Sequence, residues 1–264
     1  MNIVVCLKQV PDTEAQIKIG SDGKTIDTQD IKWIINPYDE FGVEEALRIK
    51  EKLGGTVTIL CMGPQRAVES IRTALAMGAD KAVHLCDPAL ENGDAMSAAK
   101  ALAAALKGME YDLIWCGKQA TDDDSAQFGS ILSEYLGLPE VNVVVKCEVS
   151  EDQKSVTTNR QIEGGEEVVE CQLPAVLTAQ KGLNEPRYAS LPGIMKAKKK
   201  ELKTLTLSDI GLSADEVGKA GSNTEISKMS LPSGRTAAQI IEGEGAEETA
   251  PKLAMTLRME AKII

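Results

Sequence analysis

The first half of the chain alternates short apolar runs with longer stretches in which apolar residues recur every three or four positions. The short runs predict buried strands at residues 3–7, 56–61, 81–85 and 113–116. The longer stretches predict amphipathic helices at residues 38–53, 65–77, 125–136 and one that Asp94 caps, and glycine follows each of them. This alternation indicates right-handed βαβ units and therefore an α/β protein with an open, mostly parallel sheet.

The pattern changes after Pro139. Four further apolar runs follow at residues 141–147, 155–161, 166–171 and 175–178, and short turns such as Gly164-Gly165 join them. Runs of this length with short turns predict strands that extend the sheet as antiparallel members.

The apolar pattern weakens from Leu205 onward. Residues 222–235 read as an irregular arm, and Pro251 suits the first turn of a terminal helix with a stripe of Leu253, Leu257 and Ala261. An arm without its own core needs a surface to cover. We therefore expect two parts: an α/β domain at 1–204, and an arm at 205–264 that packs on a partner subunit, with packing on its own domain as the alternative.

Composition excludes several classes of protein. The 264 residues are 43% hydrophobic, and a net charge of −11 argues against nucleic-acid binding. No run approaches the roughly 18 consecutive apolar residues of a membrane helix, so we expect no membrane insertion. Six cysteines lie in separate apolar runs without a C-x-x-C motif, which indicates reduced thiols in a cytoplasmic protein and no metal site. His84 reads as a core or sheet-edge residue, and no set of catalytic residues is recognisable.

The stretch 113–127 has the order expected of a ligand-binding loop. A strand ends at Cys116, Gly117 follows, and a helix is expected to open near Ser125. Open α/β sheets bind ligands at the carboxyl ends of their strands, and unpaired N–H groups at a helix start can hold a phosphate. Lys118 would add a positive charge. The carboxylates at 122–124 would repel a phosphate, unless they cap the helix, stabilise the loop or accept hydrogen bonds from a ribose.

The stretch 181–200 combines apolar residues, two prolines and a basic tail. Pro186 and Pro192 favour a shaped excursion over a central strand. Its apolar residues need a covering surface, which is either the core of this protein or another protein. In the second case Leu191 would be the anchor, and the lysines at 196 and 198–200 would steer the partner.

Both stretches resemble parts of one family, the beta subunits of electron transfer flavoproteins. Residues 183–192 and 194–200 resemble the loop that docks into flavin dehydrogenases, and residues 117–125 resemble the adenine-nucleotide loop. Further matches are Cys6-Leu-Lys, Asn36-Pro-Tyr-Asp39, Met62-Gly-Pro, Arg160, Glu163-Gly-Gly, Glu167, Val169 and residues 174–178. The resemblance covers nearly the whole chain and is weakest after Leu205.

The resemblance implies a Rossmann-like sheet of the adenine-nucleotide-binding type and an electron carrier rather than an enzyme. Such a beta subunit joins an alpha subunit that holds most of the shared FAD, and it binds AMP itself. It accepts electrons from acyl-CoA dehydrogenase-type flavoenzymes, as in fatty acid oxidation, and passes them on, with a quinone-reducing oxidoreductase as one acceptor.

The resemblance also implies two sets of binding residues. The cofactor set is Cys6, Leu7, Lys8, Asn36, Pro37, Tyr38, Asp39, Met62, Gly63, Gly117, Lys118, Gln119, Ala120, Thr121, Asp122, Asp123, Asp124, Ser125 and Gln127. The partner set is Leu191, Pro192, Ile194, Met195 and Lys196.

Two departures from the family leave alternatives open. Thr13 stands where many relatives have an aromatic residue, and Gln161 stands where many have glutamate. Val-Pro-Asp-Thr at 10–13 is common in relatives that bifurcate electrons from NADH and bind a second FAD in place of AMP. Those relatives usually have Asp-Gly-Asp at 122–124 and lack the Leu-Pro element, so we favour AMP. A stand-alone adenine-nucleotide sensor is the alternative from another class.

Overall fold

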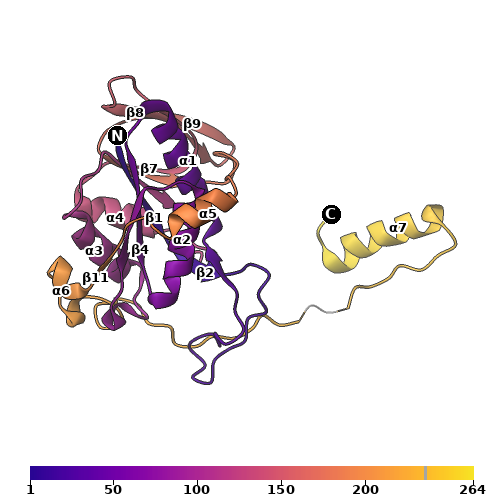
Figure 1. The fold of residues 1–264 in the computed structure, drawn as a ribbon. Coiled ribbons are helices and arrows are strands. Elements are labelled where there is room, and N and C mark those ends of the chain that lie inside the picture. The colour runs from indigo at the N-terminus through magenta and orange to yellow at the C-terminus, as the bar shows by residue number, and fades with distance from the viewer. Residues whose placement is uncertain (235–236) are drawn as a thin grey trace. The chain divides into compact units, whose positions relative to one another are not determined.

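The computed structural model describes residues 1–234 and 237–264 and divides the chain into two compact units. The first, Met1–Lys228, is called the α/β unit below, and the second, Met229–Ile264, is called the C-terminal unit. The α/β unit contains a large sheet with helices on both faces (Figure 1).

The described residues of the α/β unit form a nine-stranded sheet in the order β11-β5-β4-β1-β6-β10-β7-β8-β9. The strands are β1 (Asn2–Leu7), β4 (Thr56–Met62), β5 (Lys81–Leu85), β6 (Leu113–Gly117), β7 (Glu140–Val149), β8 (Ser155–Ile162), β9 (Gly165–Gln172), β10 (Ala175–Ala179) and β11 (Leu202–Leu205). All neighbours from β11 to β7 pair in parallel, and β7, β8 and β9 pair antiparallel. The predicted α/β class with a mostly parallel sheet is confirmed. A separate short pair joins β2 (Gln9–Pro11) and β3 (Trp33–Ile35).

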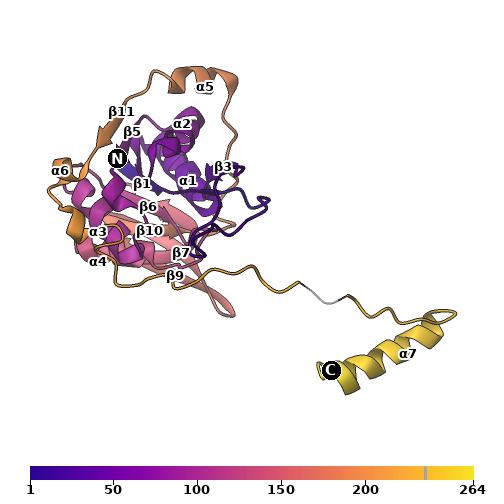
Figure 2. The ribbon, with the colours of Figure 1, turned by 90° about the horizontal axis from the view of Figure 1, so that it is seen from below.

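Helices cover the two faces of the sheet. One face carries α1 (Pro37–Leu53) and α2 (Val68–Met77), and α5 (Leu191–Ala197) packs on α2 (Figures 1 and 2). The other carries α3 (Ala95–Leu106), α4 (Phe128–Leu136) and α6 (Leu207–Ile210). Short 3-10 turns are η1 (Gln65–Ala67), η2 (Pro88–Leu90) and η3 (Ala214–Glu216).

Strand β1 shows why the apolar runs near the N-terminus are continuous. Val5 packs among the residues of α1 and α2, whereas its neighbours Val4 and Cys6 pack on the side of α3 and α4. Successive side chains of a strand point to opposite faces, so a strand with helices on both faces must be apolar at every position.

The helix expected at 125–136 begins three residues later, at Phe128. Asp124 and Ala126 have φ angles of 48° and 51°, in the left-handed region, and a helix cannot pass through such residues. Asp94 does cap its helix as predicted, because its carboxylate accepts a hydrogen bond from the N–H of Ser97 at 2.9 Å.

The strands expected to be antiparallel divide into two kinds. The prediction was wrong for β10, which lies parallel between β6 and β7. The chain leaves β7, forms the antiparallel hairpin β8–β9 at the sheet edge, and then returns to the centre. All five residues of β10 are buried, which is the position that its continuous apolar run suits.

The stretch 202–228 belongs to the α/β unit, although the sequence pattern groups residues from 205 with the arm. Strand β11 pairs with β5, and Leu207 and Val217 are buried in the core on the α3 side. The carboxylate of Asp94 accepts hydrogen bonds from the N–H groups of Asn223 and Thr224 at 2.8 and 3.1 Å. Isolated apolar residues and hydrogen bonds hold this stretch, so it lacks a periodic signal.

The C-terminal unit contains α7 (Ala246–Thr256) and the π-helical turn η4 (Leu257–Ala261). Pro251 lies inside α7 rather than in its first turn, because the helix already begins at Ala246. Neither element has a buried residue, and Met259 and Ile263 are well exposed. The expected irregular arm at 222–235 has no helix or strand in its described residues, and Arg235 lies outside them. None of the described helices is long and apolar enough to cross a membrane.

Candidate functional site

A cavity of about 180 Å³ lies at the carboxyl edge of the sheet, where β1, β4 and β6 end. The loop after β6 and the start of α3 complete its wall. This is the edge at which open α/β sheets bind ligands. Its lining residues are Cys6, Leu7, Lys8, Asn36, Asp39, Met62, Gly93, Asp94, Ala95, Ala98, Leu102, Cys116, Gly117, Lys118, Gln119, Ala120, Asp123, Ser125, Ala126, Gln127 and Phe128.

Asp39, at the start of α1, joins the ends of two strands beneath the cavity. Its carboxylate accepts hydrogen bonds from the N–H of Lys8 at 2.7 Å, the N–H of Gly117 at 3.0 Å and the side chain of Asn36 at 3.0 Å. Burial outweighs these bonds and raises the pKa of Asp39 to about 7. Through its three hydrogen bonds, the side chain of Asp39 fixes the end of β1, the end of β6 and the start of α1 at one point.

Gly117 allows this close approach of α1 to β6. A Cβ atom at this position would overlap the carboxylate of Asp39 and lie 2.8 Å from the Cβ of Tyr38. Only glycine therefore fits where the strand passes the helix start.

Asn36 fastens the loop after β6. Its amide group donates to the carbonyl of Gln119 at 2.9 Å, and its side-chain oxygen accepts from the N–H of Thr121 at 3.2 Å. The motif Asn36-Pro-Tyr-Asp39 thus connects the ends of β1 and β6, through Asp39, to the loop after β6, through Asn36. The spacing of the motif alone does not reveal this role.

The three consecutive aspartates stabilise the same loop. The ammonium of Lys8 lies 2.7 Å from Asp122 and 3.0 Å from Asp123, and the side chain of Gln119 donates to Asp124 at 2.7 Å. Burial alone would lower the pKa of Lys8, but the two carboxylates outweigh it and raise that pKa. The suggestion that an aspartate caps the next helix is wrong, because Gln127 occupies the N-cap of α4.

Three consecutive residues of the loop, Ser125, Ala126 and Gln127, line the cavity and each carries a backbone N–H group. The N–H of Ser125 donates to Asp123 at 3.1 Å, so it is already satisfied. Within the described residues, the N–H groups of Ala126 and Gln127 donate to no protein acceptor. The left-handed φ angles of Asp124 and Ala126 are typical of turns in which successive N–H groups can hold an anion.

Of the nineteen cofactor positions that the resemblance implies, thirteen line the cavity and six lie outside its lining. Those six are Pro37, Tyr38, Gly63, Thr121, Asp122 and Asp124. The implied cofactor set did not include eight lining residues, which are Gly93, Asp94, Ala95, Ala98, Leu102, Cys116, Ala126 and Phe128, although Ala126 lies within the predicted binding loop. Asp94 caps the helix that follows the parallel strand β5, and this position was the available signal for the contribution of α3.

The buried thiols and the histidine offer little reactivity. Cys6 and Cys116 line the cavity, and the hydrogen bond with Cys6, together with burial, raises the pKa of Cys116. His84 is buried with its Nε2 2.9 Å from the carbonyl of Gly63, and burial lowers its pKa. Residues 1–234 and 237–264 contain no group of three or more histidine, cysteine or acidic side chains that could hold a metal ion.

The proposed docking residues lie on α5, away from the cavity. Leu191 and Met195 are 79% and 72% exposed, and Pro192, Ile194 and Lys196 are exposed as well. Leu183 instead packs against the core on the α1 side. The apolar residues of this stretch therefore divide between the core of the protein and its surface.

Lys200 does not have the steering role that the sequence suggested for it. Its ammonium donates to the carbonyls of Leu75 and Ala79 at 2.9 and 2.6 Å, near the end of α2. These bonds commit its charge to the helix terminus, so only Lys196, Lys198 and Lys199 remain exposed in the basic tail.

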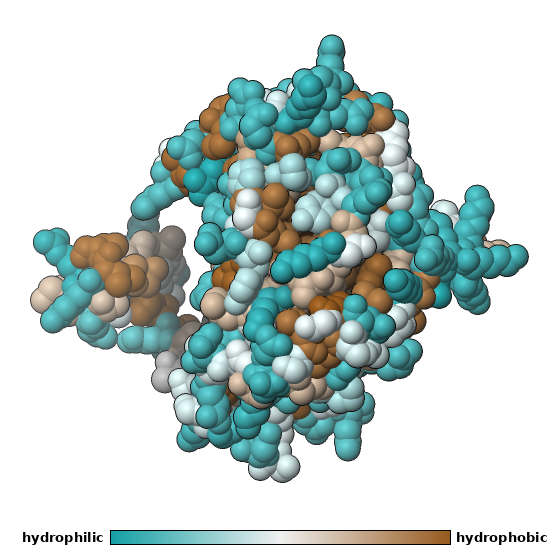
Figure 3. Space-filling view, turned by 90° about the vertical axis from the view of Figure 1, so that its left-hand side faces the viewer, coloured by the Kyte–Doolittle hydropathy of each residue, from teal (hydrophilic) through white to brown (hydrophobic). Residues whose placement is uncertain are grey.

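Other surface features of the α/β unit lie on α3, α4 and the β8–β9 hairpin. Apolar patches lie between polar side chains on the side of α3 and α6 (Figure 3), and α3 and α4 expose Met96 and Tyr135. In the β8–β9 hairpin, Arg160 donates to the carbonyl of Asn142 at 3.3 Å and to Glu167 at 3.2 Å.

Comparison with known proteins gives a consistent result. The model of the electron transfer flavoprotein domain family matches residues 23–210, well over half of the chain. The chain is 44% identical to an electron transfer flavoprotein subunit beta of Thermoanaerobacterium thermosaccharolyticum over 92% of this chain and 93% of that protein. It is 42% identical to one of Bacillus subtilis over the full length of both. It is also 39% identical, over 98% of each chain, to the caffeyl-CoA reductase-Etf complex subunit CarD of Acetobacterium woodii.

Proposed function

Because the chain belongs to the electron transfer flavoprotein family, as a beta subunit, we propose that it carries electrons from acyl-CoA dehydrogenase-type flavoenzymes, as in fatty acid oxidation, to a quinone-reducing oxidoreductase. Membership implies a flavin and an alpha subunit as partner. The electrons would be carried by FAD, and the alpha subunit would hold most of it. This chain would supply a nucleotide site, a docking surface and an arm that fastens the alpha subunit.

The nucleotide in the cavity is proposed to be AMP. The N–H groups of Ala126 and Gln127 would receive its phosphate, because they have no protein acceptor among the described residues. Lys118 lines the same cavity and forms no ion pair in the part of the chain that the structure describes. Lys8 would act indirectly, by neutralising Asp122 and Asp123 beside the phosphate.

Replacing Lys8 with methionine is expected to weaken nucleotide binding by ~1.5–3 kcal/mol, the range for hydrogen bonds to charged groups. The reason is that two carboxylates would lose their counter-ion next to an anion. The measurement is the nucleotide content of the purified heterodimer after dialysis.

Lys18→Met is the matched control, because it removes the same charge from an exposed pair, 3.8 Å from Asp30 and outside the cavity lining. Full nucleotide content in Lys8→Met, equal to that of the control, would place the phosphate elsewhere.

The docking proposal depends on one observation, the exposure of Leu191 on a short ordered helix. A leucine that is 79% exposed adds nothing to this protein's core, and apolar anchors that fill partner pockets dominate many interfaces. The exposed Lys196, Lys198 and Lys199 nearby would steer a dehydrogenase with an acidic rim.

Leu191→Ala is expected to leave folding and nucleotide content unchanged and to weaken docking by more than ~1–2 kcal/mol. The measurement is the rate of electron transfer from the dehydrogenase at limiting concentrations of the heterodimer. Val168→Ala, on β9, truncates another apolar side chain that is largely exposed, at 66%, and serves as the control. If both variants accept electrons at the unchanged rate, α5 is not the docking site.

A second candidate function is NADH-dependent electron bifurcation with a second FAD in place of AMP. Two observations favour it: the Val-Pro-Asp-Thr sequence at 10–13, and the similarity to a subunit of a caffeyl-CoA reductase-Etf complex. Extraction of the nucleotides bound to the heterodimer decides between the two, because the first function requires one FAD together with one AMP, whereas the second requires two FAD and no AMP. A stand-alone nucleotide sensor would instead purify as a folded protein without an alpha subunit.

A further inference from the structure

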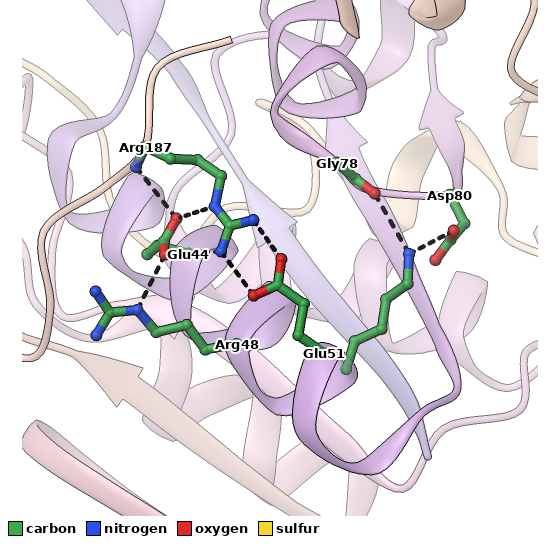
Figure 4. Close-up of polar contacts among 7 residues, drawn as sticks. Glu44, Arg48, Glu51, Gly78, Asp80 and Arg187 are labelled. Carbon is green, nitrogen blue, oxygen red and sulfur yellow. Dashed lines mark hydrogen bonds and ion pairs between the residues drawn. The ribbon is translucent and has the colours of Figure 1, made fainter. Parts of the chain in front are cut away.

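The stretch that leads into α5 lies across α1 and is held there by carboxylates (Figure 4). Arg187 donates from Nε and Nη2 to the two oxygens of Glu44, at 2.7 and 3.0 Å. Its backbone N–H donates to the same carboxylate at 3.1 Å, and Nη2 also reaches Glu51 at 3.2 Å. A guanidinium fork that engages a carboxylate in this way fixes orientation as well as position.

Glu44 is nearly inaccessible, with a side-chain exposure of 4%. Burial alone would raise the pKa of Glu44, but hydrogen bonds from Arg187 and from Arg48 outweigh it and lower that pKa. The pair is therefore ionised on both sides. Removal of Arg187 would leave a buried charge with Arg48 as its remaining partner, 3.0 Å away.

A second buried contact lies three residues earlier. The side chain of Asn184 donates to the carbonyl of Phe41 at 3.0 Å and to Glu45 at 2.9 Å. One stretch of α1 thus binds the segment at two points through Glu44 and Glu45.

The far end of α5 is held by α2. Arg72 donates to the carbonyls of Ala197 and Lys200 at 2.6 and 2.9 Å. At the middle of α5, a Cβ atom on Gly193 would overlap the carbonyl oxygen of Ala76, so the two backbones touch there. The helix is consequently fixed at both ends and at its centre.

The side chains between these contacts point outward. Tyr188, next to Arg187, is 98% exposed, and Leu191 and Met195 are also largely exposed. A helix of seven residues is not stable alone, and this one buries only Ala197. Polar contacts, rather than burial of its own apolar residues, must therefore supply much of its order.

We propose that Arg187 is a positioning residue that clamps the segment 183–190 to α1, so that Tyr188 and Leu191 are presented in a fixed arrangement to an apolar pocket with an acidic rim on a partner protein. The inference rests on the proposed docking function of α5. Pre-ordering of the segment lowers the entropy lost on docking, so the clamp contributes to affinity without touching the partner. The clamp fixes the backbone of Arg187, which is the neighbour of Tyr188. Tyr188 is therefore held in place as a second residue that contacts the partner protein.

The first test uses the full chain in its heterodimer and needs no docking partner. Hydrogen exchange of the peptide covering residues 188–197 is measured in the wild type and in Arg187→Met, and we expect exchange about tenfold faster in the variant, as for a locally opened segment. Arg48→Met is the matched control, because it removes the other cation that donates to Glu44, and that cation belongs to α1 itself rather than to the segment. Exchange that is unchanged in Arg187→Met, or raised equally by the control, would overturn the clamp.

The second test measures the dissociation constant with the dehydrogenase for Arg187→Met, Leu191→Ala and the double variant. We expect Arg187→Met to weaken docking about tenfold, the size expected for ordering a short segment, and to add much less in the Leu191→Ala background. Arg187→Lys should recover only part of the affinity, because it restores the charge without the fork. Additive effects, or complete recovery with lysine, would contradict positioning.

The two tests separate this inference from the function on which it rests. If Leu191→Ala leaves docking unchanged, the docking function fails, and hydrogen exchange alone still decides whether Arg187 orders the segment. If Leu191→Ala weakens docking but Arg187→Met does not, the docking function stands and the clamp is refuted.

Discussion

Replacing Gly117 with alanine is expected to lower the free energy of unfolding by about 1–3 kcal/mol, the usual cost of overpacking, and to prevent binding of the proposed nucleotide in the cavity. The added Cβ would overlap the carboxylate of Asp39 and lie 2.8 Å from Tyr38. Relief of this overlap moves the start of α1 away from β6. The 3.0 Å hydrogen bond from Gly117 to Asp39 would then be lost, and Asp39 also holds Lys8 and Asn36.

Denaturant unfolding and the content of co-purified nucleotide measure the two effects. Gly165→Ala is the control, because no atom lies within 4 Å of its would-be Cβ and its φ is not in the left-handed region. Equal stability and equal nucleotide content in the two variants would show that the contact between α1 and β6 does not shape the site.

Truncation of the chain after Lys228 is expected to abolish the stable heterodimer while the α/β unit stays folded. The α/β unit contains both buried core clusters, whereas α7 and η4 bury nothing among the described residues. The exposed apolar side chains of the C-terminal unit, such as Ile240 and Met259, need an external surface to offset the entropy of ordering the segment. We propose that this surface belongs to the alpha subunit.

Size-exclusion chromatography of the co-expressed subunits measures the association, and circular dichroism checks the fold of the truncated chain. The variant Leu253→Ser removes an exposed apolar side chain of α7, and Lys252→Ser removes the adjacent exposed polar one as a control. We expect only Leu253→Ser to weaken association with the alpha subunit. A truncated chain that still forms a tight flavin-bearing heterodimer would locate the interface elsewhere, with the β8–β9 hairpin around Arg160 as the next candidate.

The candidate site was predictable where the family motifs lie and unpredictable where distant segments meet. Cys6–Lys8, Asn36 and Gly117 occur in motifs next to strand ends, so the order of the parallel strands brings them to one edge. Ala98 and Leu102 follow an ordinary amphipathic pattern, and nothing local distinguishes a helix residue that faces a cavity from one that faces the core. The partnership of Lys8 with Asp122 likewise spans 114 residues and leaves no periodic trace.

The sequence by itself determined the α/β class, the four parallel strands in the first half of the chain and the C-terminal ends of the helices between them, because these depend on periodicity, capping and glycine within a few residues. Only the tertiary structure decided that β10 returns to the centre of the sheet, that α4 begins at Phe128, and that Lys200 holds a helix end rather than facing a partner. It likewise decided that Arg187 meets Glu44, 143 residues earlier in the chain. The place of β10, the role of Lys200 and the partner of Arg187 each depend on contacts between residues far apart in the chain, where burial and the pairing of charges outweigh local preference. The start of α4 depends on the left-handed turn at Asp124 and Ala126, which the apolar pattern does not reveal.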